Sequence, residues 1–271
     1  METNLWHAPF VHRSGLSDAA KLSNWLSVTQ CLNGSRGSRH LIGAECSGLV
    51  PAKIVPHHDD AFAKKDEKME LFSFKPGNSP LLVSMPHSGR CLPTGMKERM
   101  TRAGRDLVDT DWYIPRLYNF LESLDVSVLQ ANYSRYVVDL NRATDGRPLY
   151  PGQQETQVCP TSTFMSQDIY KAHEAPVKEE VSTRLLEYWL PYHRKLRLEL
   201  ERMVSEFGYA LLWDAHSIQS QLPVFFQGTL PDLNMGTAGG ASCDQSISDA
   251  IYNELAESEY RAVRDGRFKG G

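Results

Sequence analysis

The chain has 271 residues, of which 41% are hydrophobic and 23% are charged, with a formal net charge of -4 at pH 7. This composition is typical of a globular protein and excludes a disordered or fibrous chain, because enough apolar side chains are present to build a packed core. The 29 basic residues are scattered among 33 acidic ones, so no basic surface for phosphate backbones is indicated. We therefore expect no nucleic-acid partner.

Five cysteines at positions 31, 46, 91, 159 and 243 are odd in number and widely spaced. They predict neither a disulfide framework nor a cysteine-rich zinc site, and they fit a reducing compartment. No stretch reaches the roughly 18 apolar residues of a membrane span, and residues 1–10 lack the charged and apolar regions of a secretory signal. We expect a cytoplasmic protein with no membrane partner.

Residues 1–70 show no helical or strand periodicity. Glycines interrupt the pattern, and residues 57–68 read HHDDAFAKKDEK, a solvated charge run. The HHDD cluster at 57–60 is interpreted as a polar loop and not as a metal site, because no second, distant group of ligands accompanies it. We expect residues 1–70 to be a poorly structured N-terminal extension and residues 71–271 to form one domain.

From residue 71 onward, short apolar runs alternate with amphipathic segments, a pattern typical of an α/β fold. Because such runs suit strands buried on both faces, we expect a three-layer α/β/α architecture with a mixed, mostly parallel sheet. The segment 143–166 is a long loop of the kind that often covers an active site. Strands are predicted at 81–85, 126–129, 136–140 and 209–213. Helices are predicted at 109–124, at 181–207 with a kink at Pro191 and an end at Gly208, and at 247–255.

Polar side chains follow three of these predicted strands. His87 comes after the first, Asn141 and Arg142 come after 136–140, and Asp214 with His216 come after the last. Because α/β sheets place their chemistry at the carboxyl ends of strands, we expect these side chains to converge.

Asp109 and Asp111 lie in the first turn of the predicted helix at 109–124, and this turn can face the same edge of the sheet. Two imidazoles and a carboxylate, with one open position, are the ligand set of a hydrolytic zinc ion. An arginine near such a metal is the natural bidentate partner of a substrate carboxylate.

Each feature also has a simpler interpretation. A single histidine after a strand is more often a hydrogen-bonded structural residue, an aspartate at a helix start is usually a cap, and Arg142 can pair with Asp139. The joint occurrence of two histidines, two acids and an arginine at the ends of predicted strands and the start of a predicted helix favours a functional site.

Five segments stand in order along the chain: SMPHSG (84–89), DTDWYIPRLY (109–118), YSRYVVDLNR (133–142), LLWDAHSIQS (211–220) and GRFKGG (266–271). Together they resemble N-formylglutamate amidohydrolases, and more distantly zinc carboxypeptidases and aspartoacylases. This resemblance implies a zinc-carboxypeptidase-like fold and a zinc-dependent amidohydrolase that converts N-formyl-L-glutamate, a small dicarboxylate, to L-glutamate and formate in histidine degradation.

The resemblance also implies roles for individual residues. His87 and His216 are expected to bind Zn²⁺, or another divalent transition metal, together with either Asp109 or Asp111. At the place where the carboxypeptidase pattern has a ligating glutamate this chain has Arg90, which cannot bind a cation.

The substrate residues carried over are arginines and one asparagine. Asn141 and Arg142 are expected to hold one carboxylate of the substrate, and Arg135 or Arg147 the other. A dicarboxylate needs two cationic contacts.

The family resembled continues beyond a GRFKGG-like segment into a further histidine loop and a glutamate expected to act as general base. This sequence stops at Gly271, so the resemblance implies that the amidohydrolase domain at 71–271 is C-terminally truncated, and we assign no catalytic base. Two alternatives stay open: another N-acyl-amino-acid amidohydrolase or carboxypeptidase-like enzyme, or a catalytically impaired fragment that binds metal and dicarboxylate. A serine hydrolase is disfavoured, because no G-x-S-x-G elbow is present. The oligomeric state is not indicated.

Overall fold

The computed structural model describes residues 27–32, 69–147 and 156–270. Within the predicted N-terminal extension, Ser27–Leu32 form a strand, β1, that is part of the central sheet. The HHDD cluster at 57–60 lies outside the described residues.

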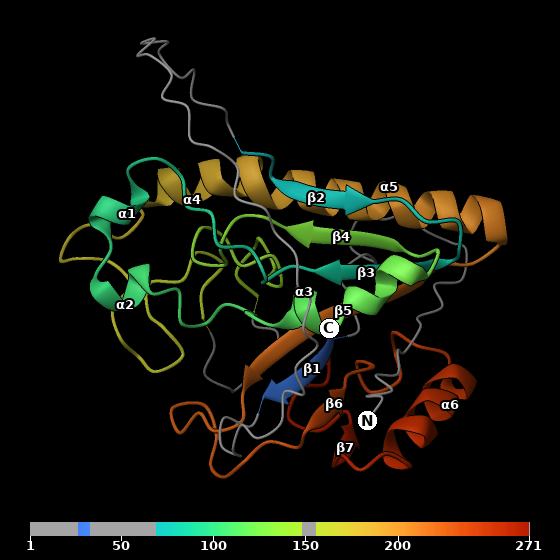
Figure 1. Cartoon of the computed structure of the whole chain (residues 1–271). Helices are drawn as coiled ribbons and strands as arrows, with labels where there is room; N and C mark the ends of the chain where they lie inside the picture. The colour runs from blue at the N-terminus through green and yellow to red at the C-terminus, as the bar shows by residue number, and fades with distance from the viewer. Residues whose placement is uncertain (1–26, 33–68, 148–155, 271) are drawn as a thin grey trace, which may run out of the picture.

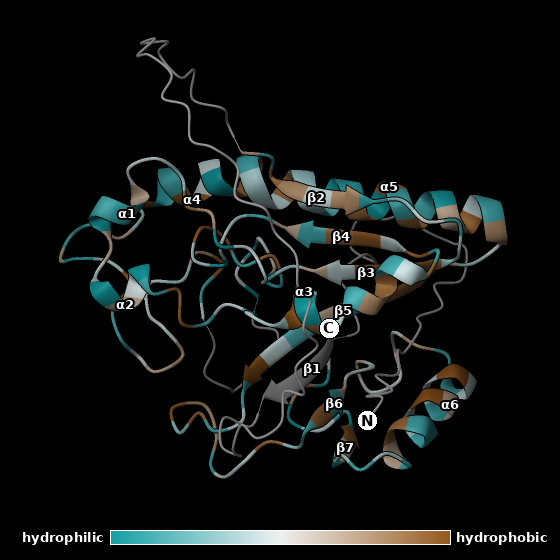
Figure 2. Ribbon diagram, in the orientation of Figure 1, coloured by the Kyte–Doolittle hydropathy of each residue, from teal (hydrophilic) through white to brown (hydrophobic). Residues whose placement is uncertain are grey.

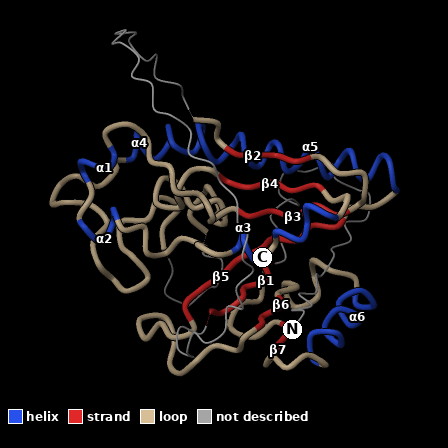
Figure 3. The backbone as a smooth tube through the Cα atoms, in the orientation of Figure 1, coloured by secondary structure: helices blue, strands red, loops and turns tan. Residues whose placement is uncertain are grey.

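Seven strands form one mixed sheet in the order β2-β4-β3-β5-β1-β6-β7 (Figures 1 and 3). The four central strands β4, β3, β5 and β1 are parallel, whereas β2 and β6 pair antiparallel with β4 and β1, and β7 runs parallel to β6. This confirms the predicted mixed, mostly parallel sheet. The other strands are β2 (Phe72–Lys75), β3 (Leu81–Met85), β4 (Ser127–Ala131), β5 (Leu211–Gln219), β6 (Leu233–Met235) and β7 (Ala262–Arg264).

Helices lie on both faces of the sheet. Successive side chains of a strand point to opposite faces, so neighbouring residues contact helices on opposite sides. On β3 the Ser84 hydroxyl lies 3.0 Å from the hydroxyl of Tyr192 in α5. On the other face Trp213 of β5 donates its indole N–H to Tyr118, which follows α3, at 2.8 Å. The α/β fold is thereby confirmed, with helices on either side of the sheet (Figure 1).

The helices are mostly short, except for one long helical rod and α6. Among the described residues, no helix is apolar over a length that would cross a bilayer. The segments are α1 (Met96–Arg99), α2 (Arg102–Arg105), α3 (Ile114–Leu117), the 3₁₀ turn η2 (Asn119–Ser123), α4 (Lys178–Arg184), the π-helical turn η3 (Leu185–Trp189), α5 (Leu190–Phe207) and α6 (Gln245–Ala256).

The long helix was predicted from its apolar stripe, and α4, η3 and α5 form it without a break. Figure 2 shows polar and apolar residues interleaved along α5, as expected of a helix with one face on the core. The predicted irregularity near Pro191 occurs as the π-helical turn η3, directly before α5. The helix ends at Gly208, whose φ of 82° is the left-handed conformation that glycine adopts without strain.

The predicted strand at 136–140 is wrong. Its apolar side chains are buried, but its backbone forms turns and no sheet ladder. Val137 N–H donates to Ser134 O at 2.9 Å, and the side chain of Arg184 donates to the carbonyl oxygens of Tyr136 and Val137. A short apolar run indicates burial and does not by itself distinguish a strand from a buried loop.

The strand predicted at 209–213 is longer than expected. β5 pairs with β3 up to Asp214, which lies opposite Ser84, and then continues beside β1 to Gln219. His216 therefore lies within a strand, two residues past the end of the β3–β5 ladder. His87 lies two residues past the end of β3, at the same edge.

Candidate metal centre and substrate site

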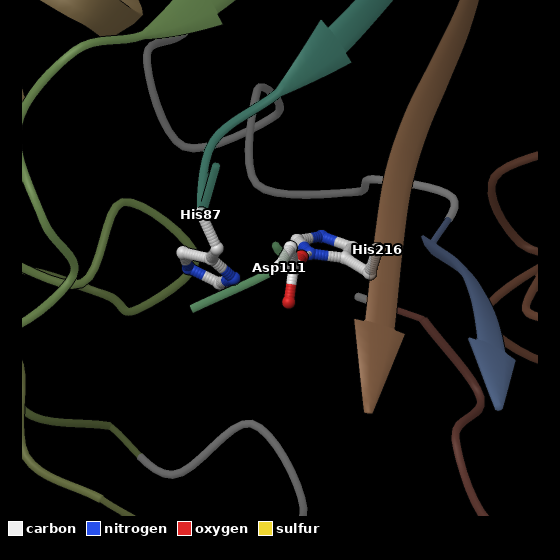
Figure 4. Close-up of side chains that lie close together, drawn as sticks. All are labelled: His87, Asp111 and His216. Carbon is white, nitrogen blue, oxygen red and sulfur yellow. Dashed lines mark ion pairs between the residues drawn. The ribbon is translucent and has the colours of Figure 1, made fainter. Parts of the chain in front are cut away.

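His87, Asp111 and His216 converge at this edge of the sheet (Figure 4). One potential ligand atom from each residue lies within 4.8 Å of the other two, and all three side chains are buried. The two imidazole rings are 4.8 Å apart between centroids. In the part of the chain that the structure describes, this is the one group of three such donors close enough to share a metal ion.

Three local features bring the group together. His87 follows β3, and His216 is carried by β5, the neighbouring strand. The N–H of Asp111 donates to the carbonyl oxygen of His87 at 2.9 Å, so the segment before α3 is tied to the first histidine.

Each histidine is bound at Nε2 by a buried aspartate. His87 Nε2 lies 2.8 Å from Asp139 Oδ1, and His216 Nε2 lies 3.0 Å from Asp214 Oδ2. A carboxylate accepts from an imidazole N–H, so the proton resides on Nε2 in both rings and Nδ1 is the atom left for a metal. His216 Nδ1 faces Asp111 Oδ2 at 3.4 Å.

The electrostatic environments of the two histidines differ. Burial and then Arg135 lower the pKa of His87, and these effects outweigh the opposing influence of Asp139. Burial also opposes protonation of His216, but the carboxylates of Asp214 and Asp111 outweigh it and raise the pKa to about 10. The surroundings of His216 therefore favour positive charge beside Asp111, which is where a bound cation would reside.

The donor set fits a divalent transition metal. Asp111 Oδ2 is a buried carboxylate oxygen without a hydrogen bond to a described residue, and it lies beside an imidazole nitrogen. Such an oxygen is costly to bury unless a cation or a hydrogen-bond donor compensates it. Two imidazoles and one carboxylate are suited to zinc and leave a further position for a substrate or water.

Asp109, the other acid left open by the sequence, does not join this group. Its Oδ2 accepts hydrogen bonds from the Tyr136 hydroxyl at 2.8 Å and from the N–H of Phe164 at 2.9 Å. Burial raises its pKa. Asp109 thus anchors the 156–169 loop beside the site, and Asp111 is the acid that lies with the two histidines.

Asp139 connects two of the predicted carboxylate-binding residues to His87, one of the candidate metal ligands. Its Oδ1 accepts from both His87 and the N–H of Asn141, at 2.8 and 2.9 Å, and its Oδ2 accepts from Arg135 at 2.6 Å. Burial alone would raise the pKa of Asp139, but Arg135 and His87 hold it well below its usual range. The next residue, Arg142, contacts Thr156 at 3.5 Å.

Arg135 and Arg147, the two candidates for the second carboxylate contact, lie in different surroundings. Arg135 is buried, and its guanidinium group lies over the ring of Phe164, 4.7 Å from the centroid. Arg147 is exposed, and its Nε donates to Asp145 at 2.6 Å within a local turn. Arg135 is therefore the one that the fold brings beside the histidines.

The sequence placed Asp214 at this edge of the sheet but assigned it no role as the partner of His216. It did not identify Tyr136 and Phe164 as the partners of Asp109. Asp214 was recognisable in principle, since residues two apart in a strand share a face. The contact from Phe164 joins residues 55 positions apart, and no local pattern signals it.

Comparison with known proteins identifies the family of the chain. Residues 79–271 match the family of N-formylglutamate amidohydrolases. The chain belongs to this family. The candidate metal ligands His87, Asp111 and His216 fall within the matched region of this amidohydrolase, and so do Asn141 and Arg142.

Individual relatives share the family and the fold. The chain is 50% identical over 203 residues to the N-formylglutamate deformylase of Pseudomonas aeruginosa, covering 74% of this chain and 76% of the relative. It is 47% identical, over the same shares, to that of Pseudomonas putida. The crystal structure of N-formylglutamate amidohydrolase from Ralstonia eutropha has a similar fold, with a TM-score of 0.62 and 24% identity over 74% of this chain and 78% of that one.

Proposed function

We propose that this amidohydrolase hydrolyses N-formyl-L-glutamate to L-glutamate and formate with a zinc ion as cofactor. The observation that carries the proposal is the buried group of His87, Asp111 and His216 in a chain that is half identical to a deformylase of that substrate.

The metal would be held by Nδ1 of the two histidines and by the Asp111 carboxylate. A zinc ion bound there supplies a Lewis acid that polarises the scissile carbonyl and lowers the pKa of a water toward 7. Asp139 and Asp214 orient the two imidazole rings and keep the proton of each ring on Nε2. The two histidines and the three aspartates are all buried, which keeps bulk water away from them and strengthens their electrostatic interactions.

Substrate orientation would come from the residues around Asp139. Asn141 and Arg142 are proposed to bind one carboxylate of N-formylglutamate, and Arg135 the other. The hydrogen bonds of Asp139 support this, because they connect His87, Asn141 and Arg135 through one carboxylate. Asp139 would thereby fix the distance between the residues that bind the substrate carboxylates and the candidate metal ligand His87.

A comparison of substrates tests the proposal. The purified chain, loaded with zinc, should release formate from N-formyl-L-glutamate, and a chelator should abolish the release until zinc is returned. N-acetyl-L-glutamate distinguishes a deformylase from a general deacylase, because only the acyl group differs. Metal binding without turnover of either substrate would contradict the proposal and favour a protein that only binds metal and dicarboxylate.

A histidine outside the site serves as a matched control, because it tests whether zinc binding and formate release depend only on the histidines of the site. His173 is an exposed histidine, and His173→Asn should keep both zinc and formate release. Asn suits the position because His173 has a φ of 67°, a conformation that asparagine tolerates.

A further inference from the structure

The π-helical turn η3 lies next to the proposed carboxylate site. It widens the helix between α4 and α5 at Leu185–Trp189, and such turns occur frequently at functional sites. Trp189 ends the turn, and His193 follows four residues later on the same helix face. The two rings stack, with centroids 3.7 Å apart and planes inclined by 23°.

The two stacked rings hydrogen-bond to the backbone on both sides of Asn141. His193 Nε2 lies 2.9 Å from the carbonyl oxygen of Leu140, and the Trp189 indole N–H donates to the carbonyl oxygen of Arg142 at 3.0 Å. A carbonyl oxygen only accepts, so His193 also donates. From the other side, Asp139 Oδ1 accepts from the N–H of Asn141.

This segment needs such donors because it is not part of the sheet. Residues 136–140 form turns, so the carbonyl oxygens at their end have no strand ladder to satisfy them. A rotation of the peptide at Arg142 would move its guanidinium group, and bidentate binding of a carboxylate depends closely on geometry.

We propose that Trp189 and His193 are positioning residues that hold the backbone of Asn141 and Arg142 and thereby set the affinity for the substrate carboxylate. The inference rests on the proposed function, in which those two residues bind a carboxylate. Trp189 and His193 act through the backbone and are not assigned any contact with the reacting atoms.

The test removes one hydrogen bond and keeps the ring stack. Trp189→Phe retains an aromatic face for His193 and lacks the indole N–H. The loss of one such bond should raise KM for N-formyl-L-glutamate about 3- to 10-fold, with kcat within about twofold and zinc content unchanged. His193→Leu removes the other donor and should show the same pattern, so the proposal stays testable if one variant folds poorly.

Two controls separate positioning from general damage. Tyr188→Phe alters a polar group in the same turn and keeps the ring, which packs against Tyr133, so its KM should equal that of the unmodified chain. The diamide of N-formyl-L-glutamate has no carboxylate, so its slow turnover should be equally fast in Trp189→Phe and in the unmodified chain.

The outcomes distinguish this inference from the proposed function. An unchanged KM in both Trp189→Phe and His193→Leu, or a fall in kcat with loss of zinc, would overturn the positioning role. If the unmodified chain releases no formate, the proposed function fails, and calorimetric titration with glutarate then decides the inference. Weaker glutarate binding by Trp189→Phe supports it, and equal binding contradicts it.

Discussion

Two aspartates stand behind the two histidines of the candidate metal centre, one for each ring. Asp139 and Asp214 each accept a hydrogen bond from an Nε2 atom, and this selects the tautomer whose Nδ1 is available to a metal ion. The arrangement explains why four charged or polar side chains can be buried together: each has a partner that compensates part of the cost of burial.

Asp214 offers a direct test at the scale of the residue. Asp214→Asn preserves size but removes the charge that orients His216 and raises its basicity. We expect the zinc Kd to increase about 10- to 100-fold, measured by competition with a chromogenic chelator. Asp145→Asn, an exposed aspartate paired with Arg147, serves as the control and should leave the Kd unchanged. An equal Kd in Asp214→Asn would show that the ring is held by its packing alone.

The choice between Asp109 and Asp111 illustrates a limit of sequence analysis at this scale. Both acids precede the same helix and are separated by one residue, so neither periodicity nor spacing distinguishes them. The choice is made by long-range contacts: Tyr136 and Phe164 bind Asp109, whereas Asp111 lies beside His216.

Among the elements, those with a strong local signal were predicted well. The strand at 81–85 and helix α6 have clear apolar patterns, and both occur close to their predicted bounds. The run at 136–140 has an equally apolar sequence but folds as a buried loop, because its backbone groups find partners in Arg184 and Val158. β1 lies in a segment with no periodicity, and its place between β5 and β6 depends on pairing with distant strands.

His193 in α5 makes the stability of the fold depend on pH. Burial lowers its pKa to about 4, against the opposing effect of its bond to Leu140. In the unfolded chain His193 takes up a proton near pH 6.5, whereas in the folded chain it does so only near pH 4. Above pH 6.5 the side chain is neutral in both states, and the folded state bears no cost from this group. Stability is lost as the pH falls from 6.5 to 4, by up to about 3 kcal/mol.

The corresponding measurement is urea unfolding at a series of pH values. His193→Gln keeps an amide donor for Leu140 but does not titrate, so its free energy of unfolding should decline less between pH 6.5 and 4 than that of the unmodified chain. Parallel declines in the two proteins would assign the acid sensitivity to other groups.

The end of α5 provides a second prediction for an element. Gly208 has a φ of 82°, and a Cβ at this position meets no neighbouring atom. Gly208→Ala should therefore destabilise the protein only through backbone strain, by about 1 kcal/mol in the free energy of unfolding. Ser205→Ala, on an exposed position of the same helix, is the control. A stability equal to that of the unmodified chain would mean that the helix end adapts without strain.

In the whole molecule, the site lies where the central parallel strands end. Figure 1 shows β3 and β5 side by side, and the segments that follow or extend them carry His87 and His216. The long helix on one face of the sheet contributes Trp189 and His193 to the loop that carries Asn141. The predicted three-layer fold was accessible from apolar periodicity, because that signal is local and repeated. The partners that orient the site residues were not, since they come from segments far apart in the sequence.

The central claim is that His87, Asp111 and His216 hold the zinc ion on which formate release depends. Zinc content and formate release should be measured together on the unmodified chain and on His87→Ala. The account predicts about one zinc ion per chain and release of formate from N-formyl-L-glutamate in the former, and loss of both in the variant. A His87→Ala protein that keeps full zinc stoichiometry, or an unmodified chain that releases formate at the same rate without metal, would contradict it.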